Sequence, residues 1–109
     1  MATAENLLEQ PPQSGPATPK VVRIFFRDNR VTVDPERCNI SKGNHDSIQW
    51  VPMGDFKFYV CFGNRTPFGS YHFNNGVDKS GEAVGVEDTY KYNVEVEGNV
   101  LDPDVIVQR

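Results

Sequence analysis

The chain has 109 residues, a length typical of one domain, and 38% of them are hydrophobic and 24% charged, as in ordinary globular proteins. Its formal net charge of −4 argues against the broadly basic surface that a protein needs to bind duplex nucleic acid. Six basic side chains lie between residues 20 and 42, and seven acidic ones between residues 82 and 104. This asymmetry predicts either neighbouring strands with solvated outer faces or a charge-complementary interface between copies of the protein.

Residues 1–20 differ in composition from the rest of the chain. A helix begun near Ala4 would end at Pro11, because proline cannot continue a helix. The following residues mix Ser, Gly, Ala and Thr with further prolines, which is the composition of a flexible linker. We therefore expect residues 1–20 to be a disordered or flexible tail and residues 21–109 to be the folded domain.

From Val21 to Trp50 hydrophobic residues recur at alternate positions, the period of a strand with one buried face. Asp28 and Asn29 tolerate left-handed backbone angles and predict a tight turn between the first two strands. The residues expected to point inward in this part of the chain are Val22, Ile24, Phe26, Val31, Val33, Cys38, Ile40, Ile48 and Trp50.

The next predicted strand covers residues 56–62 and has four apolar side chains on one face, with Lys57, Tyr59 and Cys61 on the other. From Gly63 to about Asp88 the chain is rich in glycine, which predicts a long irregular stretch with only short strands.

The clearest alternation in the sequence covers residues 90–97, where Tyr or Val alternates with Lys, Asn or Glu. Residues 105–107 predict a last strand, and no window of the domain predicts an amphipathic helix of useful length. About six to eight strands in a domain of this size predict an all-β sandwich.

Three segments, in this order, resemble a cupredoxin of the plastocyanin or azurin type. Residues 31–50, in which a Lys-Gly turn precedes an apolar-x-aromatic strand, are similar to the opening hairpin of that family. Residues 89–92 are similar to its penultimate core strand and residues 102–107 to its closing strand. The resemblance covers most of residues 21–109 and implies a Greek-key β-sandwich.

The resemblance also implies a copper site, whose ligands this chain lacks. A blue-copper centre takes one thiolate, two imidazoles and usually a weak Met ligand. In the family, the Cys, one His and the Met follow the Tyr-x-Tyr strand, but residues 93–101 contain none of these residue types. The position of the upstream His falls among residues 56–59 and holds no His either. We expect no copper and no other cofactor; the alternative is a copper electron-transfer protein with a non-standard site.

The remaining histidines and cysteines predict no further site. His45 and His72 lie in separate turn or loop regions without the close spacing of a zinc site. Cys38 and Cys61 are expected on opposed strand faces, which disfavours a disulfide. The chain has no Gly-x-Ser-x-Gly motif, no phosphate-binding loop and no Cys-x-x-Cys motif, so we expect a protein that is not an enzyme.

A candidate binding surface is predicted around the loop that follows residue 62. Loops on a rigid sandwich commonly carry recognition, and exposed aromatic rings are typical anchors. The alternative is that the loop rings fold back to cap the core, and Phe68, which follows a proline, fits that alternative well. The candidate residues are Tyr59, Phe68, Tyr71, His72 and Phe73.

We therefore predict a non-catalytic interaction module of unknown specificity. A protein partner or self-association would use unpaired sheet edges, the charge asymmetry or the loop aromatics. A carbohydrate-binding module is the alternative and requires exposed aromatic rings in one plane. No run approaches the roughly 18 apolar residues of a membrane helix, so no membrane partner is expected. No secretory signal is visible either, which favours the cytoplasm.

Overall fold

The computed structural model describes residues 19–109, which form ten strands and no helix. Within these residues no segment therefore qualifies as a helix that could span a membrane. The strands are β1 (Lys20–Arg27), β2 (Arg30–Asp34), β3 (Arg37–Ser41), β4 (Ile48–Pro52), β5 (Tyr59–Cys61), β6 (His72–Asn74), β7 (Asp88–Lys91), β8 (Asn93–Val96), β9 (Asn99–Leu101) and β10 (Asp104–Gln108). The predicted all-β class is confirmed. The predicted tail lies outside the described residues except for its last two, of which Lys20 already begins β1.

The first hairpin forms as the sequence predicts. Asp28 and Asn29 have φ angles of 53° and 60°, the left-handed values that a two-residue turn between twisted strands requires. β1 and β2 pair antiparallel on either side of this turn, with Arg27 opposite Arg30. The alternate valines and isoleucines of both strands point into the core, as the period of two predicts.

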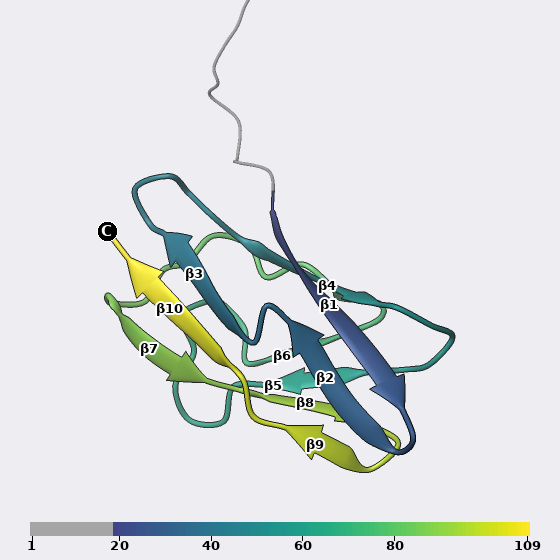
Figure 1. Cartoon of the computed structure of the whole chain (residues 1–109). Coiled ribbons are helices and arrows are strands. Elements are labelled where there is room, and N and C mark those ends of the chain that lie inside the picture. Colours follow the sequence, from purple (N-terminus) through teal and green to yellow (C-terminus); the bar gives the residue numbers. More distant parts are fainter. Residues whose placement is uncertain (1–18) are drawn as a thin grey trace, which may run out of the picture.

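The strands are arranged in two layers (Figure 1). The first layer is a sheet in the order β2-β1-β4, and the second contains the sheets β3-β10-β7 and β6-β5-β8-β9. The two sheets of the second layer are joined by one hairpin. Its first arm contains β7 and β8 and its second arm contains β9 and β10, and β7 pairs with β10 in the same register in which β8 pairs with β9. Between β7 and β8 the Tyr92 N–H donates to the Pro103 carbonyl at 3.1 Å, while Pro103 has no N–H to donate in return. The second layer is therefore one continuous surface.

The chain passes from the first layer to the second between β2 and β3. β2 pairs with β1, whereas β3 pairs in parallel with β10 in the other layer. Pro35 lies between β2 and β3, and its missing N–H ends the ladder of the first layer there. β4 returns to the first layer, where it runs parallel to β1.

An aromatic cluster fills the space between the layers. Trp50 on β4 is fully buried, and its ring stacks on Phe73 with centroids 4.9 Å apart. Phe62 stacks on Tyr92 at the same distance, and Phe68 meets Trp50 edge-on at 6.3 Å. The Trp50 indole N–H donates to the Tyr92 hydroxyl at 3.3 Å, so the buried polar atoms of both rings are paired.

Several predicted elements have different bounds in the structure. The strand predicted over residues 56–62 is confined to β5, because the Phe58 N–H donates to the Asn75 side chain at 2.8 Å instead of to a neighbouring strand. The alternating segment 90–97 is divided into parts of β7 and β8. The structure has ten strands instead of six to eight because this segment divides in two and because β6 and β9, of three residues each, are too short to read from periodicity.

The segment that resembles an opening hairpin is not a hairpin in the structure. β3 and β4 lie in different layers and pair with different partners, β10 and β1 respectively. The turn between them therefore connects the two layers at one end of the sandwich.

Candidate binding surface

The outer face of the sheet β6-β5-β8-β9 carries an exposed row of side chains. The strand registers place Asn74, Tyr59, Glu95 and Val100 side by side across the four strands. Because the alternate residues of these strands point into the core, this row points outward. A second row on the same face consists of His72, Cys61 and Asn93. We call these seven residues the Tyr59 face.

The five predicted surface residues divide into two groups. Tyr59 and Tyr71 are 51% and 44% exposed, and His72 is exposed on β6. Phe68 and Phe73 are only 2% and 3% exposed, so the prediction that they belong to the surface is wrong. Both rings pack against Trp50, because β6 directs its middle residue inward and because the loop folds back over the core. These two rings instead fold back and cap the core, which was the alternative prediction for the loop.

Hydrogen bonds within the loop fix the segment that carries Tyr71. The Thr66 hydroxyl donates to the Ser70 carbonyl at 2.9 Å and accepts from the Phe68 N–H at 3.1 Å. The Pro67 carbonyl accepts from the N–H of Val84 at 2.7 Å. The loop is thus held to a distant part of the chain, and its exposed ring is presented from a fixed backbone.

A charged contact ties the same loop to β7. The Arg65 guanidinium lies 2.9 Å from the Asp88 carboxylate and 4.7 Å from the centroid of the Tyr90 ring. The hydrogen bond that Arg65 donates to the Asp88 carboxylate holds the pKa of Asp88 below its usual value. The Tyr90 hydroxyl donates to the Val86 carbonyl at 2.7 Å, and a Cβ at Gly85 would lie within 2.7 Å of that hydroxyl. Only glycine fits at this position without displacing the contact.

Two shallow hollows lie beside the exposed tyrosines. The hollow at Tyr59 has a volume of about 300 Å³ and the one at Tyr71 about 630 Å³. Each combines a phenol ring with asparagine side chains, two in the first hollow and one in the second. The first is lined by Lys57, Tyr59, Asn74, Asn75 and Gly76, and the second by Gly63, Asn64, Gly69, Ser70, Tyr71 and His72.

The residues present do not fit a copper centre. Cys61 and His72 are opposite each other on β5 and β6, but no group of three His, Cys, Asp or Glu residues in the described part of the chain could hold a metal ion. His45, the other histidine, contacts the Glu82 carboxylate at 2.8 Å in a different region. A blue-copper site needs two imidazoles and a thiolate together.

The two cysteines are free thiols, in agreement with the prediction that they do not form a disulfide. Cys38 is buried, as predicted for an inward position on its strand, and burial raises the pKa of its thiol. A thiol of this kind behaves as a small apolar side chain. Cys61 is partly exposed on the Tyr59 face.

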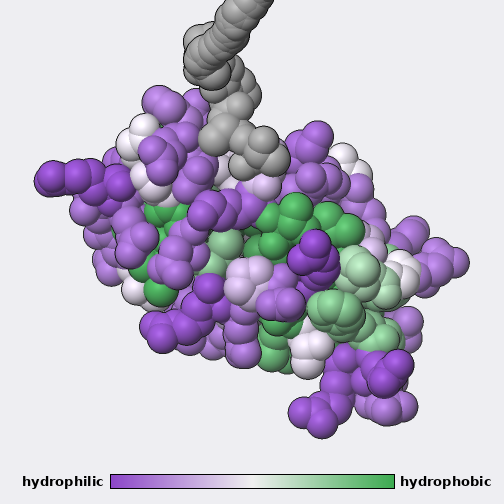
Figure 2. Space-filling model, turned by 45° about the horizontal axis from the view of Figure 1, so that its top comes forward, coloured by the Kyte–Doolittle hydropathy of each residue, from purple (hydrophilic) through white to green (hydrophobic). Residues whose placement is uncertain are grey.

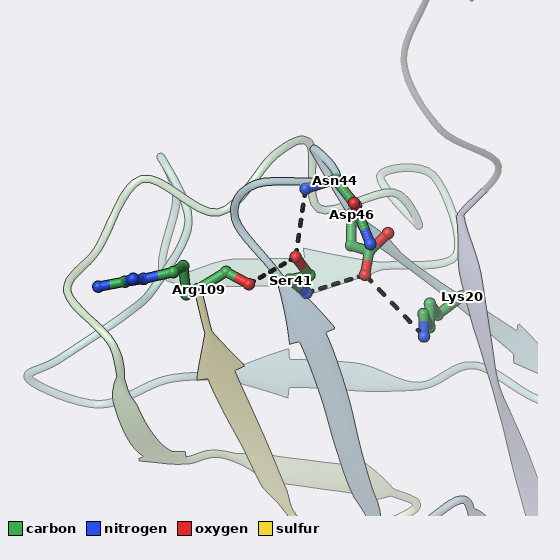
Figure 3. A network of polar contacts seen from close by, with 5 residues as sticks. All are labelled: Lys20, Ser41, Asn44, Asp46 and Arg109. Atoms are coloured by element: carbon green, nitrogen blue, oxygen red, sulfur yellow. Dashed lines mark hydrogen bonds and ion pairs between the residues drawn. The ribbon is translucent and has the colours of Figure 1, made fainter.

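A polar network that the sequence did not reveal closes one end of the sandwich (Figure 3). The Asp46 carboxylate, which is almost buried, accepts from the Ser41 N–H at 2.8 Å and lies 3.9 Å from the Lys20 ammonium. The Ser41 hydroxyl donates to the Arg109 carbonyl at 2.8 Å and accepts from the Asn44 N–H at 3.2 Å. The start of β1, the turn after β3 and the end of the described chain are joined there, so the network has a structural role.

A second missed cluster lies on the outer side of the sheet β3-β10-β7. Arg37, Asp104 and Lys91 form one cross-strand row, with the Asp104 carboxylate 3.5 Å from the arginine and 3.0 Å from the lysine. The carboxylate raises the pKa of Lys91. The row joins three strands through contacts between opposite charges.

No protein-family model matches the chain, and no curated protein matches it either.

Proposed function

We propose that this chain is a cupredoxin-like domain without copper that acts as a non-catalytic binding module, with the Tyr59 face and the adjoining Tyr71 as its contact surface. The observation that carries the proposal is the division of the aromatic residues. Phe68 and Phe73 complete the core, so the exposed rings of Tyr59 and Tyr71 are not required for packing. Exposed tyrosines on a rigid scaffold are typical anchors of binding surfaces.

The two-layer β architecture supports the cupredoxin-like part of the proposal. Three sequence segments resemble the family, and two of them form buried strands of the second layer, with Tyr90 and Tyr92 inside. The Greek-key connection of the strands is part of the same proposal. The fold alone does not identify the function, because one fold serves many functions. The function is therefore proposed from the residues on the surface.

The absence of copper chemistry is tested by titration with cupric ion. We expect neither an intense blue absorption nor stoichiometric binding, because the loop between β8 and β9 supplies no sulfur or imidazole ligand. An intense blue complex with one copper per chain would contradict the proposal.

A protein partner is the occupant that the Tyr59 face favours. The face mixes a ring, an exposed valine, a carboxylate and amides, and the hollow beside Tyr59 is shallow, which favours a protein interface over a deep ligand site. A benzophenone amino acid at position 59, introduced in the cells from which the chain comes, should give a cross-linked adduct. The same probe at the exposed Glu36 is the matched control. Equal adducts from both positions, or none from position 59, would contradict the proposal.

Self-association is a special case of the same proposal. Sedimentation at several concentrations should then show a dimer that is lost in the Tyr59→Ser/Val100→Ser variant. A monomer at every concentration removes self-association and leaves a different protein as the partner.

A carbohydrate is the second candidate ligand, and the two hollows favour it. Each offers one tyrosine ring for the apolar face of a sugar and at least one asparagine side chain for its hydroxyls. A glycan array should give hits that Tyr59→Ala or Tyr71→Ala abolishes. An array without hits removes this candidate.

A further inference from the structure

The outer face of the first layer differs from the Tyr59 face in charge and composition. The register between β1 and β2 places Phe25 opposite Thr32 and Arg27 opposite Arg30, and Met53 continues the row beside Phe25 on the β4 side. Phe25 is 39% and Met53 48% exposed. Figure 2 shows hydrophobic surface along the side of the molecule where β1 and β4 lie, bordered by hydrophilic side chains. We call this surface, made of Arg23, Phe25, Arg27, Arg30, Thr32 and Met53, the arginine face.

The arginines of this face have no acidic partner in the described residues. Of the ion pairs between residues 19 and 109, none includes Arg23, Arg27 or Arg30. Asp34 is opposite Arg23 in the ladder, but the two side chains form no ion pair. Arg27 and Arg30 stand directly opposite each other, an arrangement of like charges that destabilises a hairpin. A carboxylate placed between them would remove this repulsion.

A hollow with a mixed polar and apolar lining lies beside these charges. Its volume is about 390 Å³, and its lining combines the rings of Phe25 and Phe26 with Met53, Thr32 and Arg27. An aliphatic side chain that enters it would cover Phe25 and Met53, which are otherwise in water. The matching ligand is thus a peptide with an aliphatic residue between two carboxylates.

The chain contains such a peptide in its first eighteen residues. Residues 1–18 include two acidic side chains, Glu5 and Glu9, and no basic one. Leu7 lies midway between the two glutamates. Glu, Leu and Glu therefore alternate with the same period of two as Arg, Phe and Arg on β1. Placed antiparallel to β1, the segment matches Glu9 with Arg23, Leu7 with Phe25 and Glu5 with Arg27.

The length of the intervening chain permits this arrangement. Residues 10–18 separate Glu9 from the described part, and nine residues span up to about 30 Å when extended. From residue 19 to Arg23 the chain advances by about 13 Å along β1. The segment can therefore turn back and reach the arginine face of its own domain. A short tether also gives it an effective concentration on the order of millimolar.

We propose that residues 5–9 of this chain bind the arginine face of the same molecule, with Leu7 in the hollow at Phe25 and Met53 and the two glutamates on the arginines. The arginine face is then an intramolecular docking surface, and it becomes available to other acidic partners only when this segment leaves it. The Tyr59 face lies on the other layer, so the two surfaces can be tested separately.

The first test uses the Met53 methyl group as a reporter in the full-length protein. Its ¹H–¹³C resonance and the amide resonances of residues 23–30 should differ between wild type and the Leu7→Ser/Leu8→Ser variant. Val84→Ser, which changes an exposed valine outside the arginine face, is the matched control and should leave these resonances in place. If wild type and the double variant give superimposable spectra in this region, the proposal is wrong.

Charge reversal tests the pairing itself. Glu5→Arg/Glu9→Arg should shift the Met53 methyl resonance to its position in the leucine variant, and so should Arg23→Glu/Arg27→Glu. The combination of both pairs should restore the wild-type position of this methyl resonance, because the charges are complementary again. If the wild-type resonance position is lost in each pair of substitutions and is not restored in the combined variant, the glutamates do not pair with these arginines.

Dilution distinguishes the molecule's own segment from that of a second copy. Binding within one molecule predicts resonance positions that do not depend on protein concentration and a monomer in sedimentation. Resonances that move towards those of the leucine variant on dilution, together with a dimer at high concentration, would overturn the intramolecular assignment.

Discussion

The aromatic residues of this molecule form two groups, and neighbours in the sequence belong to different groups. Phe73 stacks on the buried Trp50, whereas His72, the residue before it on β6, is exposed. Phe58 is fully buried, whereas Tyr59, the residue after it, is half in water. The inner group holds the two layers together, and the outer group contributes little to packing. On these strands the position within a period of two, rather than the residue type, decides which aromatic side chains face the solvent.

The largest expected effect is that of Trp50→Ala. Because this ring contacts four other aromatic rings at the centre of the sandwich, its removal should cost about 3–5 kcal/mol of the free energy of unfolding. Denaturant unfolding followed by circular dichroism measures this loss. A loss below about 1 kcal/mol would mean that the cluster is not the centre of the core.

Phe73→Ala and Tyr71→Ala compare the two groups most closely. The first should cost roughly 3–4 kcal/mol because it opens a cavity beside Trp50. The second should change stability by only about 0.5 kcal/mol, as is usual for a surface substitution. Equal losses in the two variants would show that the exposed ring is also structural, and the distinction between the groups would fail.

Two glycines of the loop differ in the space that their backbone positions leave for a side chain. Gly85→Ala should cost about 1–3 kcal/mol, because its Cβ would lie 2.7 Å from the Tyr90 hydroxyl and 3.0 Å from the Cα of Pro67. Gly69→Ala, which has no neighbour within 4 Å, should be nearly neutral. Thermal unfolding of both variants checks the difference, and a neutral Gly85→Ala would show that the loop is not pinned to β7.

Tyr92→Phe tests the buried hydroxyl that contacts Trp50. It leaves the Trp50 indole N–H unpaired and should cost about 1–2 kcal/mol at neutral pH. Burial raises the pKa of Tyr92 above its ordinary value, so the folded state keeps the proton longer than the unfolded state. Wild type should therefore lose stability as the pH rises above about 10, and the variant should lose less. An unchanged alkaline profile in the variant would contradict this assignment.

The smallest effect is expected at the exposed Arg65–Asp88 contact. The arginine lowers the pKa of Asp88 in the folded state. The contact therefore stabilises the fold at pH values above the ordinary aspartate pKa, and this stabilisation is lost as the pH falls through the lower folded pKa. Asp88→Asn should reduce the dependence of stability on pH below about 4 while changing little at neutral pH. A pH profile identical to that of wild type would show that the contact is not formed in solution.

Sequence periodicity was sufficient to predict the longer strands and most of the core. The alternation in residues 22–33 and 90–96 is local, and the structure buries the residues expected there except Phe26, which is only partly buried. Periodicity could not show that the strand through Tyr92 belongs to two sheets, because that depends on which neighbours pair with it.

The loop aromatics show a similar limit of local patterns. Phe68 and Phe73 are buried because Trp50 lies above them, and Trp50 comes from a strand in the other layer. The network at Asp46 likewise joins residues that are far apart in sequence. For the same reason, only three of the five predicted surface residues are exposed.

The central claim is that the outer aromatic group binds a partner and does not support the fold. Tyr71→Ala/His72→Ala, made in the chain that carries the cross-linking amino acid at position 59, measures both quantities in one protein. We predict an unfolding free energy close to that of the unsubstituted cross-linking chain and a loss of the cross-linked adduct. Undiminished cross-linking, or a loss of stability as large as that of Phe73→Ala, would contradict the claim.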